Sequence, residues 1–195
     1  MKEIVILLEE PSAREMLSGV LPRIVDESSV TIRYIVFEGK SDLEDGIEGK
    51  LRGYRNPQAR FLVMRDQDAA PDCKNIKQRL VDKCINAGKP HAVVRIACRE
   101  LETIYLADLA AVEAGLEMSG LAALQGRKGY RWPDSECGDP ADRLNRVTNG
   151  NYQKVSGSRA IGRYLDLANN RSASFKNLIS GLRRLASELE DSVDY

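Results

Sequence analysis

Four short apolar runs, separated by stretches with helical spacing, constrain the fold of this chain more than any other feature. The first run, Ile4 to Leu8, is apolar throughout, as expected of a parallel strand that is buried on both faces. The other three runs lie at residues 31–37, 60–64 and 92–97. Strands that alternate with helices form right-handed βαβ units. The sequence therefore predicts an α/β fold, with a mostly parallel sheet flanked by helices.

Helix signals support these connections. Ser12 to Glu15 matches a capping box and is expected to open the first helix, which Pro22 would kink or shorten. A helix or loop is predicted at residues 43–54, and further helices of the same half at residues 73–87 and 101–114.

The strand signal fades after Gly115. Only helices are predicted beyond it, at residues 117–124, 140–147, 160–167 and 175–189. We therefore expect an α/β domain over residues 1–115 and an α-helical C-terminal extension over residues 116–195 that packs on it.

The composition is that of an ordinary globular protein, with 43% hydrophobic and 30% charged residues. No apolar run is long enough to cross a membrane, and the first residues lack the layout of a secretory signal. We therefore expect a cytoplasmic protein without membrane contact. The four cysteines have no CxxC spacing, which favours free thiols. The single histidine, His91, argues against zinc sites and against nucleophiles that depend on histidine.

Charge is unevenly distributed along the chain, although the net value is zero. Residues 1–118 carry a net charge of −3, residues 119–184 carry +7, and the last eleven residues carry −4. The basic later part suits an anionic partner, but solvated helices would give the same pattern.

Acidic residues follow every predicted strand. They are Glu9 and Glu10, Glu38, Asp66 and Asp68, and Glu100 and Glu102. Parallel strands end along one edge of a sheet, where ligands of open α/β folds bind. Asp66 and Asp68 are two positions apart, so their side chains are predicted to point to the same side. Carboxylates without imidazole suit Mg²⁺ or Mn²⁺, so the sequence predicts a divalent cation site at this edge.

Two acidic stretches, by their sequence and their places after the strands, resemble the signature of the TOPRIM fold. Primases, type IA and II topoisomerases and overcoming-lysogenization-defect (OLD) nucleases share that fold. The first stretch is Leu8–Ser12 after the first strand, and the second is Asp66–Asp68 after the third. More closely, the chain resembles an uncharacterised prokaryotic family of TOPRIM-like proteins, domain of unknown function 4276, whose members are often encoded beside an ATPase. The stretches that carry this resemblance are residues 37–43, 65–68, 98–102 and 152–154.

The resemblance implies a metal-dependent nuclease that hydrolyses DNA or RNA phosphodiesters with Mg²⁺ or Mn²⁺. Glu9, Asp66 and Asp68 would be catalytic and would bind metal, and Glu100 or Glu102 would complete a second metal position. The resemblance also implies an AAA- or ABC-type ATPase partner and a role in anti-phage defence.

Two glutamates compete for the catalytic position. The family pattern is EGxSD, a glutamate followed by glycine and, after one further residue, by serine and aspartate. Residues 38–42 match this pattern, whereas the stretch that begins at Glu9 has Glu10 in place of the glycine. We prefer Glu9, because the fold places one further strand between this glutamate and the Asp66–Asp68 pair.

Basic residues near the acids are assigned to substrate binding. Lys40 and Arg65 lie beside them in the sequence, although Arg65 is equally an ion-pair partner. Gly157 and Ser158 are expected to open a helix, with Lys154 and Arg159 completing a phosphate cradle.

Basic and aromatic residues also mix in two other stretches. Residues 50–55 have the pattern of a nucleic-acid surface or of a solvated loop, and Trp132 either stacks on a base or packs under a loop. Two further functions stay open: a TOPRIM-shaped binding or regulatory subunit, and a receiver-like signalling domain. The sequence also leaves open whether the chain forms a homo-oligomer.

Overall fold

The computed structural model describes residues 1–168 and 171–191, and in this part of the chain four strands form one parallel sheet. The strands are β1 (Glu3–Leu8), β2 (Thr31–Val36), β3 (Ala59–Asp66) and β4 (Val93–Ala97). Their order is β2-β1-β3-β4, and every neighbouring pair is parallel. The predicted α/β fold with a parallel sheet is confirmed.

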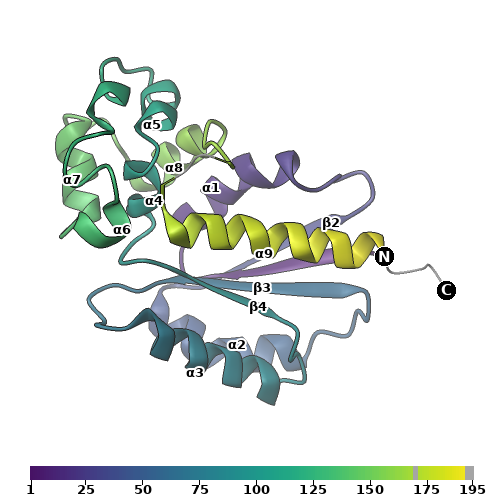
Figure 1. The fold of residues 1–195 in the computed structure, drawn as a ribbon. Helices are drawn as coiled ribbons and strands as arrows, with labels where there is room; N and C mark the ends of the chain where they lie inside the picture. The colour runs from purple at the N-terminus through teal and green to yellow at the C-terminus, as the bar shows by residue number, and fades with distance from the viewer. Residues whose placement is uncertain (169–170, 192–195) are drawn as a thin grey trace.

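Helices cover both faces of the sheet (Figure 1). On one face lie α2 (Lys40–Arg52) and α3 (Cys73–Asn86), which pack against Val5, Leu7 and Val63. Side chains alternate along a strand, so Ile4, Ile6 and Leu8 point to the opposite face. The uninterrupted apolar run of β1 is explained by burial on both faces.

The opposite face carries helices from both ends of the chain. These are α1 (Pro11–Val20), α8 (Lys154–Gly162) and α9 (Ala173–Glu190). Helices α1 and α8 touch closely through two glycines, because a Cβ on Gly162 would lie 2.5 Å from the carbonyl oxygen of Met16. A Cβ on Gly19 would lie 2.6 Å from the backbone nitrogen of Arg163. One hydrophobic cluster joins Leu17, Ile161 and Leu182, so the C-terminal helices share a core with the sheet. The boundary near residue 115 stays a prediction.

Short helices gather at the end of the sheet where the strands finish (Figure 1). They are α4 (Glu102–Leu106), α5 (Leu109–Gly115), α6 (Pro133–Glu136) and α7 (Pro140–Val147). No helix within the described residues has both the length and the apolar character needed to span a membrane.

Four helix predictions need correction. The predicted helix 101–114 is broken by Asp108, whose side chain caps α5 at Ala111 N–H and also accepts from Asp166 N–H. The predicted capping box is wrong, because Pro11 occupies the first turn and Glu10 is the N-cap residue. The predicted helix 117–124 is reduced to the 3-10 turn η2 (Ala122–Leu124). The predicted helix 160–167 instead lies earlier, as α8.

Pro22 shortens the first helix, as predicted. Helix α1 ends at Val20, and the chain continues as the 3-10 turn η1 (Leu21–Arg23). A proline inside a helix removes a backbone donor, so the tighter turn is the expected outcome.

Candidate functional site

The carboxyl ends of β1 and β3 form a switch point of the sheet. From β1 the chain crosses by α1 to β2 on one side, and from β3 it crosses by α3 to β4 on the other. Helices α1 and α3 also lie on opposite faces. Ligands of open α/β sheets bind in the crevice outside such a point. Glu9, Glu10 and Asp66 end these two strands, so their carboxylates lie at this position.

Glu9 and Asp66 are in direct contact across the switch point. Oε2 of Glu9 accepts a 3.0 Å hydrogen bond from the backbone N–H of Asp66. The same oxygen lies 3.7 Å from Nε of Arg65. Burial raises the pKa of Glu9 above its ordinary value, and this outweighs the hydrogen bond and the arginine.

Asp66 is a buried carboxylate among other carboxylates. Its side chain accepts a 3.2 Å hydrogen bond from Leu101 N–H, and the residue is only 8% exposed. Burial raises its pKa well above the ordinary value, and the charges of Glu10, Glu102 and Glu9 raise it further. The site therefore concentrates negative charge that a cation would stabilise.

Glu102 is the first residue of α4 and is 1% exposed. Its Oε1 accepts a 3.0 Å hydrogen bond from the hydroxyl of Tyr152, whereas its Oε2 is buried without a hydrogen-bond partner among the described residues. Burial raises the pKa of Glu102. A buried carboxylate oxygen without a partner is costly, so this atom is available to a ligand.

Lys154 supplies the positive charge beside these acids. Its Nζ lies 2.6 Å from Oε2 of Glu10. Burial opposes the charged form of Lys154, but the pair with Glu10 and the charges of Glu102 and Asp66 raise its pKa overall. Lys154 is the first residue of α8. This helix packs on α1, which begins directly after Glu10.

The predicted phosphate cradle is wrong. Gly157 and Ser158 lie inside α8 and are buried, because the helix begins at Lys154. Arg159 is on the surface, where its Nε pairs with Oε2 of Glu15 on α1. Arg159 therefore links two helices and does not join Lys154 at a helix start.

Asp68 lies beyond the end of β3 and pairs with two cations. Strand β3 ends at Asp66, and Asp68 has a left-handed backbone with φ of +56°. The side-chain alternation behind the prediction of a shared side therefore does not extend to Asp68. Its Oδ2 lies 3.1 Å from Nη2 of Arg65 and 3.2 Å from Nζ of Lys40. Electrostatically Asp68 remains a neighbour of Glu9.

A pocket of about 530 Å³ opens beside Asp68, between the starts of α2 and α3. Lys40, Arg65 and Arg79 contribute its positive charges. Arg65 is buried and pairs with Glu44 as well as Asp68, so the ion-pair interpretation of Arg65 holds in this structure.

Glu100 and Glu38 lie outside the acid cluster. Oε2 of Glu100 accepts a 3.1 Å hydrogen bond from Ala141 N–H at the start of α7. Glu38 follows the edge strand β2 and is exposed, and its backbone N–H donates to Asp42. The sequence left open Glu9 or Glu38, and Glu100 or Glu102. The structure places Glu9 and Glu102 near Asp66, and Glu38 and Glu100 away from it.

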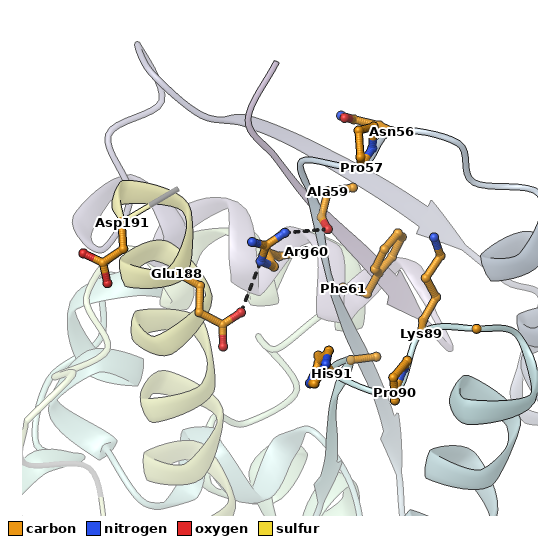
Figure 2. A pocket seen from close by; sticks show the side chains of 12 residues that line it. Asn56, Pro57, Ala59, Arg60, Phe61, Lys89, Pro90, His91, Glu188 and Asp191 are labelled. Atoms are coloured by element: carbon orange, nitrogen blue, oxygen red, sulfur yellow. Dashed lines mark hydrogen bonds and ion pairs between the residues drawn. The ribbon is translucent and has the colours of Figure 1, made fainter. Parts of the chain in front are cut away.

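Another pocket, of about 580 Å³, lies at the opposite edge of the sheet, where β3 and β4 begin (Figure 2). Phe61, Lys89 and His91 line it, and Arg60 pairs with Glu188 of α9 across its side at 3.2 Å. None of the predicted site residues lines this pocket.

The oxygen atoms of the acid cluster are of the kind that binds a divalent cation, but their present positions do not converge on one ion. Carboxylate oxygens and the orphaned Oε2 of Glu102 are suitable ligands. However, no three Asp, Glu, Cys or His side chains within the described residues are grouped so that they could hold a metal ion. Glu9, Asp66 and Glu102 would have to turn from their present hydrogen bonds toward a shared ion.

Sequence reasoning assigned no role to Tyr152 and only partly recognised Glu10. Tyr152 lies 50 positions from Glu102, and only the packing of α8 brings its hydroxyl to that carboxylate. Glu10 was noted as a strand-end acid, but its partner Lys154 comes from the distant helix α8.

Comparison with known proteins gives a family for this chain. Residues 8–183 match the family described as "Domain of unknown function (DUF4276)", and the chain therefore belongs to that family. No curated protein matches the chain.

Two solved structures are similar in fold. One is the C-terminal region of the Burkholderia pseudomallei OLD protein, with 14% identity, a TM-score of 0.55, and coverage of 94% of this chain and 98% of that one. The other is the C-terminal region of the Xanthomonas campestris pv. campestris OLD protein, with 15% identity, a TM-score of 0.50, and coverage of 97% and 98%. The predicted family and the predicted TOPRIM-like fold are confirmed, and the similarity to the OLD proteins is one of fold.

Proposed function

We propose that this member of the DUF4276 family is a metal-dependent nuclease that hydrolyses nucleic-acid phosphodiesters with Mg²⁺ or Mn²⁺. One observation carries the proposal. Asp66 is buried at the switch point between β1 and β3, with Glu9, Glu10 and Glu102 around it, while Lys154 pairs with Glu10 and Arg65 lies beside Glu9. Four clustered carboxylates beside two cations are costly unless they serve a further cation or a proton.

Glu9, Asp66 and Glu102 are the proposed metal ligands. Asp68, held by Arg65 and Lys40, lies beside Glu9 and completes the acidic row. Divalent ions bound there would activate water and stabilise the charge that develops on a phosphodiester. Glu100 is the weaker candidate for a ligand, because it lies outside the acid cluster, where its Oε2 accepts from Ala141 N–H at the start of α7.

The chain's own residues have three further roles in this proposal. Glu9 lies against Asp66, where its carboxylate either binds the metal or accepts a proton from the attacking water. Lys154 reaches the cluster from α8 and is half exposed, so its ammonium contacts a phosphate oxygen of the substrate. Lys40 lines the pocket beside Asp68 and binds the phosphate backbone.

An ATPase partner and a role in anti-phage defence are proposed from the family resemblance. The similarity in fold to the C-terminal regions of OLD proteins supports the nuclease assignment, and the residues themselves add nothing to the defence role.

Single-turnover cleavage tests the proposal. Plasmid, single-stranded DNA and tRNA are incubated with Mn²⁺ and with wild-type protein, D66A or D45A. Asp45 is an exposed acid on α2 without an ion pair among the described residues, which makes D45A a matched control. We expect D66A to lose at least about 100-fold in rate, as for a group that binds a catalytic metal. Equal rates for wild type and D66A would refute the assignment.

A non-catalytic binding or regulatory subunit is the second candidate. It is favoured by the present separation of the carboxylates, which point to different hydrogen-bond partners. This alternative gains if no substrate is cut even with the candidate ATPase present. The receiver-like alternative needs a fifth strand, and the described residues form only four.

A further inference from the structure

A basic and aromatic segment lies on the group of short helices beside the candidate site. It runs from Arg127 to Trp132 and contains three cations and two aromatic residues but no acid. We call it the 127–132 segment. None of the substrate-binding residues proposed above belongs to it.

The cations and the indole of this segment are exposed. Trp132 is 51% exposed, and Arg127, Lys128 and Arg131 are also exposed. None of these three cations forms an ion pair with any residue in the described part of the chain. Lys154, Arg159 and Lys40, by contrast, all pair with carboxylates. The interpretation of Trp132 as an aromatic packed under a loop is therefore wrong.

The backbone of the segment is held in place although these side chains are exposed. The backbone N–H of Gly129 donates a 2.8 Å hydrogen bond to Oε2 of Glu136. Nε2 of Gln125 donates to the carbonyl oxygen of Tyr130, and the guanidinium of Arg143 lies over the Tyr130 ring at 5.5 Å. The cations and the indole are thus presented by an ordered loop, which lowers the entropy cost of binding.

The segment is attached to the same edge of the sheet as the acid cluster. Helix α6 follows Trp132 directly, and Oδ2 of its Asp134 accepts a 3.1 Å hydrogen bond from Ser174 N–H at the start of α9. Arg99, in the loop between β4 and Glu102, donates from Nη1 to the carbonyl oxygen of Gly138 at 3.3 Å. One bond therefore fastens this region to α9, and the other fastens it to the loop that leads to Glu102.

We propose that the 127–132 segment binds a single-stranded stretch of the nucleic acid whose cleavage is proposed above, so this inference rests on that proposed function. Arg127, Lys128 and Arg131 contact successive phosphates, and Trp132 stacks on an unpaired base. Stacking needs an exposed base face, which a duplex does not offer in its interior. Because the segment and the acid cluster lie at the same edge of the sheet, the bound nucleic-acid strand would run from the segment toward the cluster.

The chain offers a direct probe, because Trp132 is its only tryptophan. The full chain in EDTA is titrated with an oligothymidylate of about 20 nucleotides, a length that exceeds the site size of common single-strand binders. We expect saturable quenching of tryptophan fluorescence, and weaker quenching by a duplex of the same length. Saturating binding without any change in fluorescence would overturn the stacking of Trp132.

Charge-matched variants test the cations. R127Q/K128Q is compared with K77Q/R183Q, which removes two exposed cations, one from α3 and one from α9, that form no ion pair among the described residues. We expect R127Q/K128Q to lower the slope of log affinity against log salt by about 1.4, because each phosphate contact with a single strand contributes about 0.7. K77Q/R183Q should keep the wild-type slope. Equal slopes for both variants would overturn the proposal.

The stacking residue has its own control. W132L and Y164L each remove an exposed aromatic, and binding is followed by the anisotropy of a labelled oligonucleotide. We expect about a tenfold loss of affinity for W132L and less than about a twofold loss for Y164L. Unchanged affinity for W132L contradicts the proposal. Circular dichroism of each variant checks that it is folded.

Failure of this inference is distinguishable from failure of the proposed nuclease. Binding in EDTA does not depend on cleavage, so a chain that binds through the segment but never cuts refutes only the nuclease. A chain that cuts with Mn²⁺ while R127Q/K128Q and W132L bind like wild type refutes only the segment. No binding of any nucleic acid refutes the segment outright.

Discussion

The backbone N–H of Asp66 donates a 3.0 Å hydrogen bond to the carboxylate of Glu9, although 57 positions separate the two residues. The contact follows from the order of the sheet, because β1 and β3 are neighbours and Leu8 pairs with Met64 in their register. Strand β1 ends at Leu8, whereas β3 continues past this level to Asp66, so the acid that follows β1 meets the last residue of β3. This one relationship places the proposed catalytic glutamate beside the proposed metal-binding aspartate.

Replacing Asp66 by asparagine is expected to change how stability depends on pH. The folded-state pKa of Asp66 lies well above its ordinary value of 3.8 because of burial, then Glu10, Glu102 and Glu9. The folded state therefore binds the proton of Asp66 more tightly than the unfolded state does. The stability that this proton contributes is present below the ordinary pKa of 3.8 and is lost as pH rises from there through the folded-state pKa.

An asparagine side chain does not ionise, and its carbonyl oxygen can still accept from Leu101 N–H. In EDTA, D66N should therefore gain stability relative to wild type as pH rises above about 4, by about 1.4 kcal/mol for each pKa unit of the shift. Urea unfolding at several pH values measures the difference, with D45N as the control. A difference between D66N and wild type that is constant with pH would contradict this assignment.

Removing the hydroxyl of Tyr152 is expected to destabilise the protein. The hydroxyl donates to Oε1 of Glu102, whose other oxygen already lacks a partner among the described residues. Y152F removes this hydrogen bond from a buried carboxylate, which costs about 1–3 kcal/mol. Chemical denaturation measures the loss. Y164F, at an exposed tyrosine, should change the unfolding free energy by less than about 0.5 kcal/mol.

The contact between α1 and α8 depends on Gly162. A Cβ there would lie 2.5 Å from the carbonyl oxygen of Met16, so G162A forces the helices apart and should cost about 1–3 kcal/mol. G49A is the matched control, because Gly49 is inside α2 with no heavy atom within 4 Å of its Cβ position. There alanine should stabilise the protein by up to about 1 kcal/mol. Thermal unfolding of both variants is the measurement, and an equal effect of both would rule out the close contact.

The sheet could be predicted from the sequence because its strands leave a local pattern. The runs at Ile4–Leu8 and 60–64 are largely apolar, and burial on both faces dictates that pattern. Helix boundaries in the second half were less predictable. Asp108 breaks a continuous helical pattern because its side chain finds donors at Ala111 and Asp166, and the second of these is 58 positions away. No local signal reveals such a partner.

For the candidate site, the sequence could predict which strand-end acids become neighbours but not how their side chains are directed. Strand-end acids become neighbours by topology alone, so Glu9, Asp66 and Glu102 could be named in advance. The side-chain directions could not, because Asp68 leaves the strand with a positive φ and turns to Arg65 and Lys40. Lys154 and Tyr152 reach the acids only through the packing of α8 on α1, which depends on glycines far apart in the chain.

The acids at the switch point between β1 and β3 are proposed to hold a divalent cation. Calorimetric titration of Mn²⁺ into the metal-free chain measures this binding, with wild type compared with D66N, E102Q and the control E100Q. We expect saturable binding that is weakened at least about tenfold in D66N and E102Q, as expected when a ligand or its support is lost, and nearly unchanged in E100Q. Identical titrations for wild type and D66N, or no saturable binding by wild type, would contradict it.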